Sequence, residues 1–258
     1  MGASQCNPGA RVEKIATEKI LLRVADGTEM GAYVARPTGD AKHPGLLVFQ
    51  EAFGVNAHIR DVTERFAREG YVAIAPELYH RTAPPGFEVS YSDFDAVRPH
   101  MQAMTEPATI QDIRAAFDWL RSDPHTESAK IASVGFCLGG RVSFLACATL
   151  PLHAAISFYG GGIAPAMLSR VAELHAPMLF FWGGLDKHIP QEQIRAVLDE
   201  FKKANKAYVN VEFSDADHGF FCDARPSYHA AAADLAWSLS KTYLHIHASE
   251  MDERSRLL

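Results

Sequence analysis

The sequence predicts an α/β fold, in which helices cover both faces of a mostly parallel sheet that begins with an antiparallel hairpin. Two observations support this prediction. From Gly45 onward, short apolar runs alternate with amphipathic stretches, a rhythm typical of parallel strands buried on both faces. Before them, Glu13–Val24 and Met30–Arg36 flank the turn-forming stretch Ala25–Thr28, which is typical of an antiparallel pair.

The individual elements follow from the period of the apolar residues. Buried strands are expected where short apolar runs lie between turn residues, at Gly45–Gln50, Tyr71–Ala75, Lys130–Phe136, Ala154–Phe158, Pro177–Trp182 and Ala207–Phe213. Helices are expected where apolar residues recur every three or four positions, at Ile59–Glu69, Thr109–Arg121, Gly139–Thr149, Gln191–Lys203 and Tyr228–Ile246. Thr105 and Pro107 suit the N-cap and first-turn proline of the second helix.

Three stretches lack a clear period. Glu77–His100 contains Pro84, Pro85, Gly86 and Pro99, so we expect a surface loop that carries substrate contacts or acts as a lid. The two ends, residues 1–12 and 249–258, are expected to be disordered. No repeat or linker divides the chain, and we therefore expect one domain spanning residues 1–258.

Composition excludes several classes of protein. The 258 residues, 48% of them hydrophobic and 22% charged, match an ordinary globular domain that buries roughly 70–75% of its unfolded surface. A net charge of -6 provides no basic surface for a nucleic acid. We expect a small-molecule substrate and a monomer or homodimer.

Neither a membrane segment nor a metal motif is visible. The start lacks an apolar leader segment, and no run reaches the ~20 apolar residues that a bilayer requires, so we expect a cytoplasmic protein. The four cysteines, Cys6, Cys137, Cys147 and Cys222, lack paired metal-ligand spacing. Free thiols are therefore expected, without a metal or another cofactor.

One cysteine stands in a catalytic context. Cys137 follows a β-rich run, lies between Gly135 and Gly139, and precedes a helical pattern. This is the strand–turn–helix setting of the G-x-S-x-G nucleophile motif, with sulfur in place of the hydroxyl. Glycines two positions either side leave room for a tight turn, and a helix N-terminus favours a thiolate. The alternative is a small buried packing residue.

A carboxylate and a histidine follow in the order of the α/β-hydrolase fold, which is nucleophile, acid, histidine. Asp186 follows one predicted strand and His218 follows the next, so both are expected at the carboxyl edge of the sheet. Asp215 and Asp217 are rival acids, but they lie too close to His218 in the chain to orient its ring. His188 is the rival base, and we interpret it as a solvated loop residue.

At this point the chain resembles the dienelactone hydrolase family, or carboxymethylenebutenolidases. The similarity runs from about Glu18 to about Leu244. The matching stretches are Gln50-Glu51-Ala52-Phe53-Gly54-Val55-Asn56, Pro76-Glu77-Leu78-Tyr79, Gly135-Phe136-Cys137-Leu138-Gly139-Gly140, Tyr159-Gly160, Gly183-Gly184-Leu185-Asp186 and Asp217-His218-Gly219-Phe220. The resemblance implies an α/β-hydrolase that cleaves an ester or lactone, such as a carboxymethylenebutenolide, through a thioester on the cysteine.

The resemblance also implies residue roles. Cys137 would be the nucleophile, His218 the base and later the acid, and Asp186 the orienting carboxylate. The N–H groups of Leu138 and Ala52 would form the oxyanion hole. Glu51 would keep the resting cysteine protonated and take its proton when substrate binds. Substrate contacts would come from Tyr79, Phe53, Tyr159 and Phe220.

The family clamps a substrate carboxylate with two arginines. Arg81 matches the first of these positions, whereas Cys222 stands where the second is expected, and the nearest guanidinium in the sequence is that of Arg225. The bidentate clamp is therefore altered. Three other functions stay open: a broad carboxylesterase for neutral esters, a non-catalytic binding protein, and a thiol redox sensor that pairs Cys137 with Cys147 or Cys222.

Overall fold

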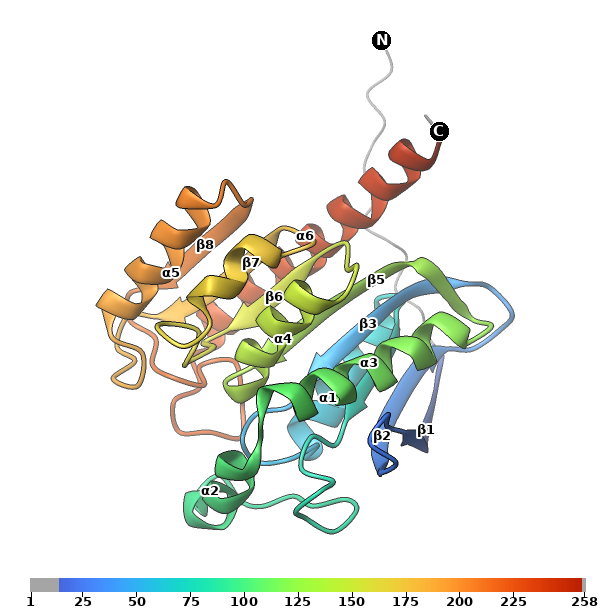
Figure 1. The fold of residues 1–258 in the computed structure, drawn as a ribbon, viewed down its shortest axis with the longest axis horizontal. Coiled ribbons are helices and arrows are strands. Elements are labelled where there is room, and N and C mark those ends of the chain that lie inside the picture. The colour runs from blue at the N-terminus through green and yellow to red at the C-terminus, as the bar shows by residue number, and fades with distance from the viewer. Residues whose placement is uncertain (1–13, 257–258) are drawn as a thin grey trace.

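The computed structural model describes the backbone of residues 14–256 and the side chains of residues 14–248. Within that range one eight-stranded sheet has the order β1-β2-β4-β3-β5-β6-β7-β8 (Figure 1). β2 pairs antiparallel with β1 and β4, and the other pairs are parallel. The strands are β1 Ile15–Arg23, β2 Glu29–Pro37, β3 His43–Phe49, β4 Val72–Pro76, β5 Thr126–Phe136, β6 Ala155–Phe158, β7 Met178–Gly183 and β8 Tyr208–Phe213.

The N-terminal hairpin forms where the sequence predicted it. Leu22 of β1 faces Met30 of β2 in the register, and both are buried. The turn between them is closed by Asp26, whose carboxylate accepts hydrogen bonds from the N–H and the hydroxyl of Thr28. Gly27 adopts φ 88°, a conformation that glycine tolerates without steric cost. Local turn chemistry therefore sets this register.

Helices cover both faces of the sheet, with α1 and α6 on one face and α3, α4 and α5 on the other (Figure 1). Their bounds are α1 Ala57–Arg68, α2 Phe94–Ala103, α3 Glu106–Ser122, α4 Leu138–Thr149, α5 Gln191–Lys203 and α6 Ala230–Arg256, with a 3₁₀ helix at Leu168–Glu173. Every residue of β4, β6 and β7 is buried, as expected for strands covered on both sides. The predicted α/β-hydrolase architecture is confirmed.

Two expectations about irregular segments were wrong. The stretch Glu77–His100, expected to be a loop, contains most of helix α2, which includes Pro99 and buries only Val97. So little burial leaves almost no apolar period to detect in the sequence. Residues 249–256, expected to be disordered, continue helix α6 to Arg256. Residues 1–12 and 257–258 lie outside the described part of the chain.

The cap of α3 was predicted correctly. Thr105 is the N-cap, its hydroxyl accepts a hydrogen bond from the N–H of Ala108 at 3.4 Å, and Pro107 lies in the first turn. Among residues 14–256, no helix is long and apolar enough to span a bilayer.

Candidate active site

Cys137 lies on a strained turn between β5 and α4. Its backbone has φ 53° and ψ -114°, a conformation that costs a non-glycine residue roughly 1–3 kcal/mol. The turn is held because the N–H of Cys137 donates to the carbonyl of Phe158 at 3.0 Å. A β-carbon at Gly135 would collide with the carbonyl of Gly139, and one at Gly139 would collide with that of Phe49. The two glycines are therefore required by the turn.

His218 and Asp186 meet at the carboxyl edge of the sheet, in the loops after β8 and β7. Nδ1 of His218 donates to Oδ2 of Asp186 at 2.7 Å, and the N–H of His188 donates to Oδ1 at 2.8 Å. Cys137 lies near enough to the ring of His218 to help raise its pKa, and both residues line the same cavity. The structure thus places Cys137 and the His218–Asp186 pair at one site.

Electrostatics favour a charged imidazole in this chain. Burial by itself would lower the pKa of His218, but the hydrogen bonds to Asp186 and Cys137 outweigh it and raise this pKa to about 10. Burial would likewise raise the pKa of Asp186, yet the hydrogen bond and charge of His218 hold it below its ordinary value. The protonation of His218 and Asp186 is therefore set by their neighbouring side chains rather than by their burial.

The rival acids and base have other surroundings. Asp215 is exposed and approaches Nε2 of His229 at 3.3 Å. Asp217 accepts the backbone N–H of His218 at 2.7 Å rather than a ring nitrogen. His188 is exposed, with its ring centroid 5.3 Å from that of His218. None of the three is bonded to the ring of His218 as Asp186 is.

A cavity of about 470 Å³ opens onto the sulfur. It contains the two predicted oxyanion-hole residues, Ala52 and Leu138, together with Cys137 and His218. Because α4 begins at Leu138, the N–H of this residue is one of the unpaired donors of the first turn. The other lining residues are Phe53, Tyr91, Phe94, Met101, Arg141, Gly161, Gly162, His188, Ile189 and Arg225.

A second cavity of about 770 Å³ adjoins the first and shares four of its lining residues, Tyr91, His188, His218 and Arg225. Its remaining wall comes from the start of α1, from residues 88–92, and from the segment after His218. Residues 88–92, which precede α2, thus line the second cavity, and one of them, Tyr91, lines the first as well. This placement agrees with the expected substrate-contact region, although whether the segment closes as a lid stays a prediction.

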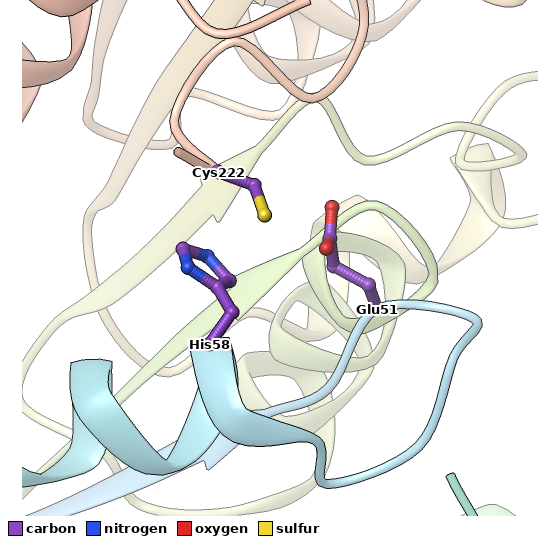
Figure 2. A group of neighbouring side chains, drawn as sticks. All are labelled: Glu51, His58 and Cys222. Atoms are coloured by element: carbon purple, nitrogen blue, oxygen red, sulfur yellow. The ribbon is translucent and has the colours of Figure 1, made fainter. Parts of the chain in front are cut away.

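Glu51 is fully buried beside the cavity. Its Oε1 accepts a hydrogen bond from Nη1 of Arg225 at 3.1 Å, while its Oε2 is buried and accepts none. Figure 2 shows its carboxylate pointing toward the side chains of His58 and Cys222. The carboxylate expected to control the thiol is therefore engaged by a guanidinium rather than hydrogen-bonded to Cys137.

The expectation for Arg81 is not supported by its position. Its Nη1 and Nη2 donate to both oxygens of Asp112 at 2.8 Å each, and its Nε donates to Asp26 at 2.7 Å. It does not line the cavity that contains Cys137. Because two carboxylates already satisfy this guanidinium, we correct the assignment: Arg81 ties the hairpin turn to α3 instead of binding substrate.

Of the four residues predicted to contact substrate, one lines the cavity and the other three do not. Phe53 lines the cavity. Tyr159 is fully buried, with its ring centroid 5.1 Å from that of His218. Tyr79 and Phe220 do not line the cavity: the hydroxyl of Tyr79 donates to the carbonyl of Ala52 at 3.0 Å, and Phe220 packs in the core against Tyr159. These two support the site rather than contact a ligand in it.

Several lining residues escaped sequence reasoning. Arg141 lies four residues after Cys137, one turn along α4, and helical spacing from the nucleophile could have identified it. Arg225, noted only as the nearest guanidinium, stacks over Phe53 and Tyr91 at 5.8 and 5.6 Å from their ring centroids. Tyr91, Phe94 and Met101 come from the stretch expected to be irregular or from its continuation, where the sequence has no pattern to place them.

Proteins of known family are similar to this chain in sequence. The model of the "Dienelactone hydrolase family" matches residues 30–247. A Synechocystis protein named "Putative carboxymethylenebutenolidase" is 36% identical over 83% of this chain and 90% of its own length. The "Carboxymethylenebutenolidase" of Pseudomonas putida is 33% identical over 85% of this chain and 92% of its own.

A solved structure agrees with the sequence relatives. The crystal structure of a "Putative Dienelactone Hydrolase" from Klebsiella pneumoniae superposes with a TM-score of 0.82 and 32% identity, covering 90% of this chain and 99% of the other. The residues matched by the family model, 30–247, include the second strand of the hairpin, the tight turn at Cys137 and the loops that contain Asp186 and His218. The chain belongs to the dienelactone hydrolase family.

Proposed function

We propose that this protein hydrolyses an ester or lactone with Cys137 as the nucleophile, His218 as the base and Asp186 as the orienting acid. The observation that carries the proposal is that Cys137, on its strained turn, and His218, bonded to Asp186 at 2.7 Å, line the same cavity of about 470 Å³. A nucleophile, a base in hydrogen-bond reach and a third orienting group form the signature of covalent catalysis.

The reaction takes two steps. The sulfur of Cys137 attacks the carbonyl carbon, the carbon–oxygen bond to the leaving alcohol breaks, and His218 gives the alkoxide its proton. Water then adds to the thioester, His218 accepts a proton from it, and the carbon–sulfur bond breaks. The acid leaves, the imidazole is protonated again as at the start, and the sulfur is free once more. For a lactone, acid and alcohol leave as one hydroxy acid.

The N–H groups of Leu138 and Ala52 stabilise the oxyanion of each tetrahedral intermediate in this proposal. Leu138 contributes a free first-turn donor, and both residues line the cavity next to the sulfur. Donors directed at the developing charge lower the barrier more than they stabilise bound substrate. Removing one such donor typically costs about 10²–10³ in kcat.

Glu51 acts through Arg225 in this scheme. The guanidinium of Arg225 pairs with Glu51 and also interacts electrostatically with Cys137. While Glu51 neutralises Arg225, the sulfur gains less stabilisation as a thiolate. A substrate that draws Arg225 toward itself leaves Glu51 free to take the thiol proton of Cys137, and this proton returns to the sulfur when the thioester has been hydrolysed. This role deepens the expectation that Glu51 restrains the resting thiol.

The substrate class favoured by the cavity is a small lactone with a carboxylate. Arg141 lines the cavity and forms no ion pair with a carboxylate of residues 14–248, unlike Arg81. Arg225 supplies a second positive group on the same wall. A charged hydrogen bond to a substrate carboxylate is worth roughly 1.5–3 kcal/mol. Neutral esters would lose this contribution.

The decisive experiment traps the thioester. Rapid quenching during turnover of a carboxylate-bearing lactone, followed by peptide mass spectrometry, should show an acyl adduct on the peptide with Cys137, removable by hydroxylamine. The same mixture with Cys137→Ala should give none and no turnover. Turnover by the Cys137→Ala protein would refute the mechanism. A neutral aryl ester run in parallel tests the charge preference separately.

A further inference from the structure

A second cluster of reactive side chains lies behind the proposed catalytic sulfur. Glu51, His58 and Cys222 come from the end of β3, the start of α1 and the segment after His218, and Figure 2 shows their ends pointing toward one another. One donor atom from each lies within 4.8 Å of the other two. We propose that Glu51, His58 and Cys222 form a binding site for a zinc ion.

Each of the first two residues keeps a donor atom without a partner. Oε2 of Glu51 and Nε2 of His58 form no hydrogen bond, although both residues are buried, with 0% and 7% of their surface exposed. Leaving a buried polar atom unpaired costs about 1–3 kcal/mol. Two such atoms directed at one thiol are explained if a cation binds between them.

The atoms around the three residues resemble the outer shell of a metal site. Oε1 of Glu51 is held by Arg225 at 3.1 Å. Nδ1 of His58 lies 3.8 Å from Oδ1 of Asp223, which leaves Nε2 for the ion. The hydroxyl of Tyr91 accepts from Asn56 at 2.9 Å, and Tyr91 is close enough to Cys222 to act on its pKa. Such partners orient ligands and fix the tautomer of a ligating histidine.

The donor set favours zinc over other common cations. One thiolate, one imidazole and one carboxylate are the ligand types that zinc accepts, whereas magnesium and calcium require oxygen ligands. Tetrahedral coordination at 2.0–2.3 Å would bring donor pairs to about 3.5 Å, so a pair at the 4.8 Å limit would have to close by about 1 Å. The thiolate and carboxylate cancel the charge of a divalent ion, and Arg225 then faces a neutral group.

An ion can reach the cluster because His58 lines the 770 Å³ cavity. Three protein ligands leave a fourth position for water. The site does not depend on the proposed reaction, since binding can be measured without substrate. It does engage Glu51, so a bound ion would remove this carboxylate from the control of the thiol and reduce hydrolysis reversibly. The sequence concealed the site because its ligands lie 7 and 164 positions apart.

The test measures zinc affinity by competition with a chelator on the full-length protein. We expect one ion per chain in the wild type, and affinity more than about 100-fold weaker in Cys222→Ser and in His58→Gln, because each removes a ligand. Asp223→Asn, which alters only the outer shell at an exposed residue, should cost about tenfold. Circular dichroism and thermal unfolding without metal establish that each variant is folded.

Cobalt provides a signature of the sulfur ligand. Co²⁺ in the wild-type site should show a thiolate-to-metal absorption band in the near ultraviolet, which Cys222→Ser abolishes. The matched control is Cys137→Ser, which removes the thiol that lines the neighbouring cavity and should retain both the band and the affinity. If Cys137→Ser abolishes them and Cys222→Ser does not, the ion binds the catalytic pair and the proposal is wrong. Absence of saturable zinc binding would also overturn it.

Discussion

Two histidines in loops at the carboxyl edge of this sheet pair with a buried aspartate, and only one of these pairs faces a cysteine. Nδ1 of His218 contacts Asp186 at 2.7 Å, and Nε2 of His80 contacts Asp112 at 3.0 Å. Both aspartates are buried. Judged by the pair alone, the two arrangements offer similar chemistry.

Their remaining partners differ. Asp112 also receives both terminal nitrogens of Arg81, and the second ring nitrogen of His80 is buried without a partner. The opposite side of His218 faces Cys137 and the cavity. A histidine–aspartate pair therefore becomes a candidate base only where its free nitrogen meets a group that can react. The other pair ties the loop after β4 to helix α3.

The largest effect is expected for Cys137, the residue that distinguishes the surroundings of the His218 pair from those of the His80 pair. Cys137→Ala should reduce hydrolysis below about one per cent of wild type while the fold persists, because the side chain is small and lies at the cavity wall. Steady-state kinetics and far-ultraviolet circular dichroism check this. Activity above that level in a folded variant would remove the reason for preferring the His218 pair.

Replacing the aspartate of each pair by asparagine sharpens the contrast. Asp186→Asn should lower kcat by about 10²–10⁴, because the imidazole loses its orientation and charge partner. Asp112→Asn should leave kcat within a few-fold and destabilise the protein by roughly 1.5–3 kcal/mol, because Arg81 loses a charged hydrogen-bond acceptor. Kinetics and urea unfolding on both variants decide. The reverse pattern would mean that the roles are exchanged.

The next largest effect is expected on KM, when the arginine of the cavity, Arg141, is compared with Arg81 of the other pair. Arg141→Gln should raise KM for a carboxylate-bearing lactone about 10- to 100-fold and leave neutral esters nearly unchanged, since it removes a charged contact worth roughly 1.5–3 kcal/mol. Arg81→Gln is the matched control and should affect neither KM. Equal losses on both substrates for Arg141→Gln would indicate a structural role for this residue.

A smaller, two-directional effect is expected for Glu51→Gln. Releasing Arg225 from its carboxylate should favour the thiolate of Cys137, so alkylation by iodoacetamide near neutral pH should be several-fold faster, while turnover becomes slower. Alkylation and kcat measured against pH on the same preparations test this, with Glu64→Gln as a remote control. Unchanged alkylation together with normal turnover would exclude Glu51 from thiol control.

The smallest effect is the pH dependence of stability. Because the pKa of His218 is raised from 6.5 to about 10, its pairing stabilises the fold fully below pH 6.5 and progressively less as the pH rises toward 10. The thermal stability of wild type relative to His218→Asn should therefore decline over that interval. His80→Asn serves as the comparison, and a constant difference for His218→Asn would contradict the raised pKa.

Local patterns were enough to predict much of this protein. The Gly135 and Gly139 bracket around Cys137 identifies the nucleophile turn because a tight turn excludes β-carbons wherever it occurs. Apolar period predicted α5 with its observed bounds, Gln191–Lys203. Helix α2 escaped because a short, exposed helix carries almost no such period.

Charge partners, in contrast, were decided only by the tertiary structure. Arg81 finds its carboxylates 31 and 55 positions away, and Glu51 meets Arg225 across 174 positions, so no short motif encodes either pairing. The fold decides which carboxylates come within reach of each guanidinium. The sequence by itself determined the fold, the tight turn at Cys137 and the placement of Asp186 and His218 after successive strands, because these depend on steric and periodic rules within a few residues. Which arginine stays free for a substrate depends on distances between elements, and only the folded chain sets those distances.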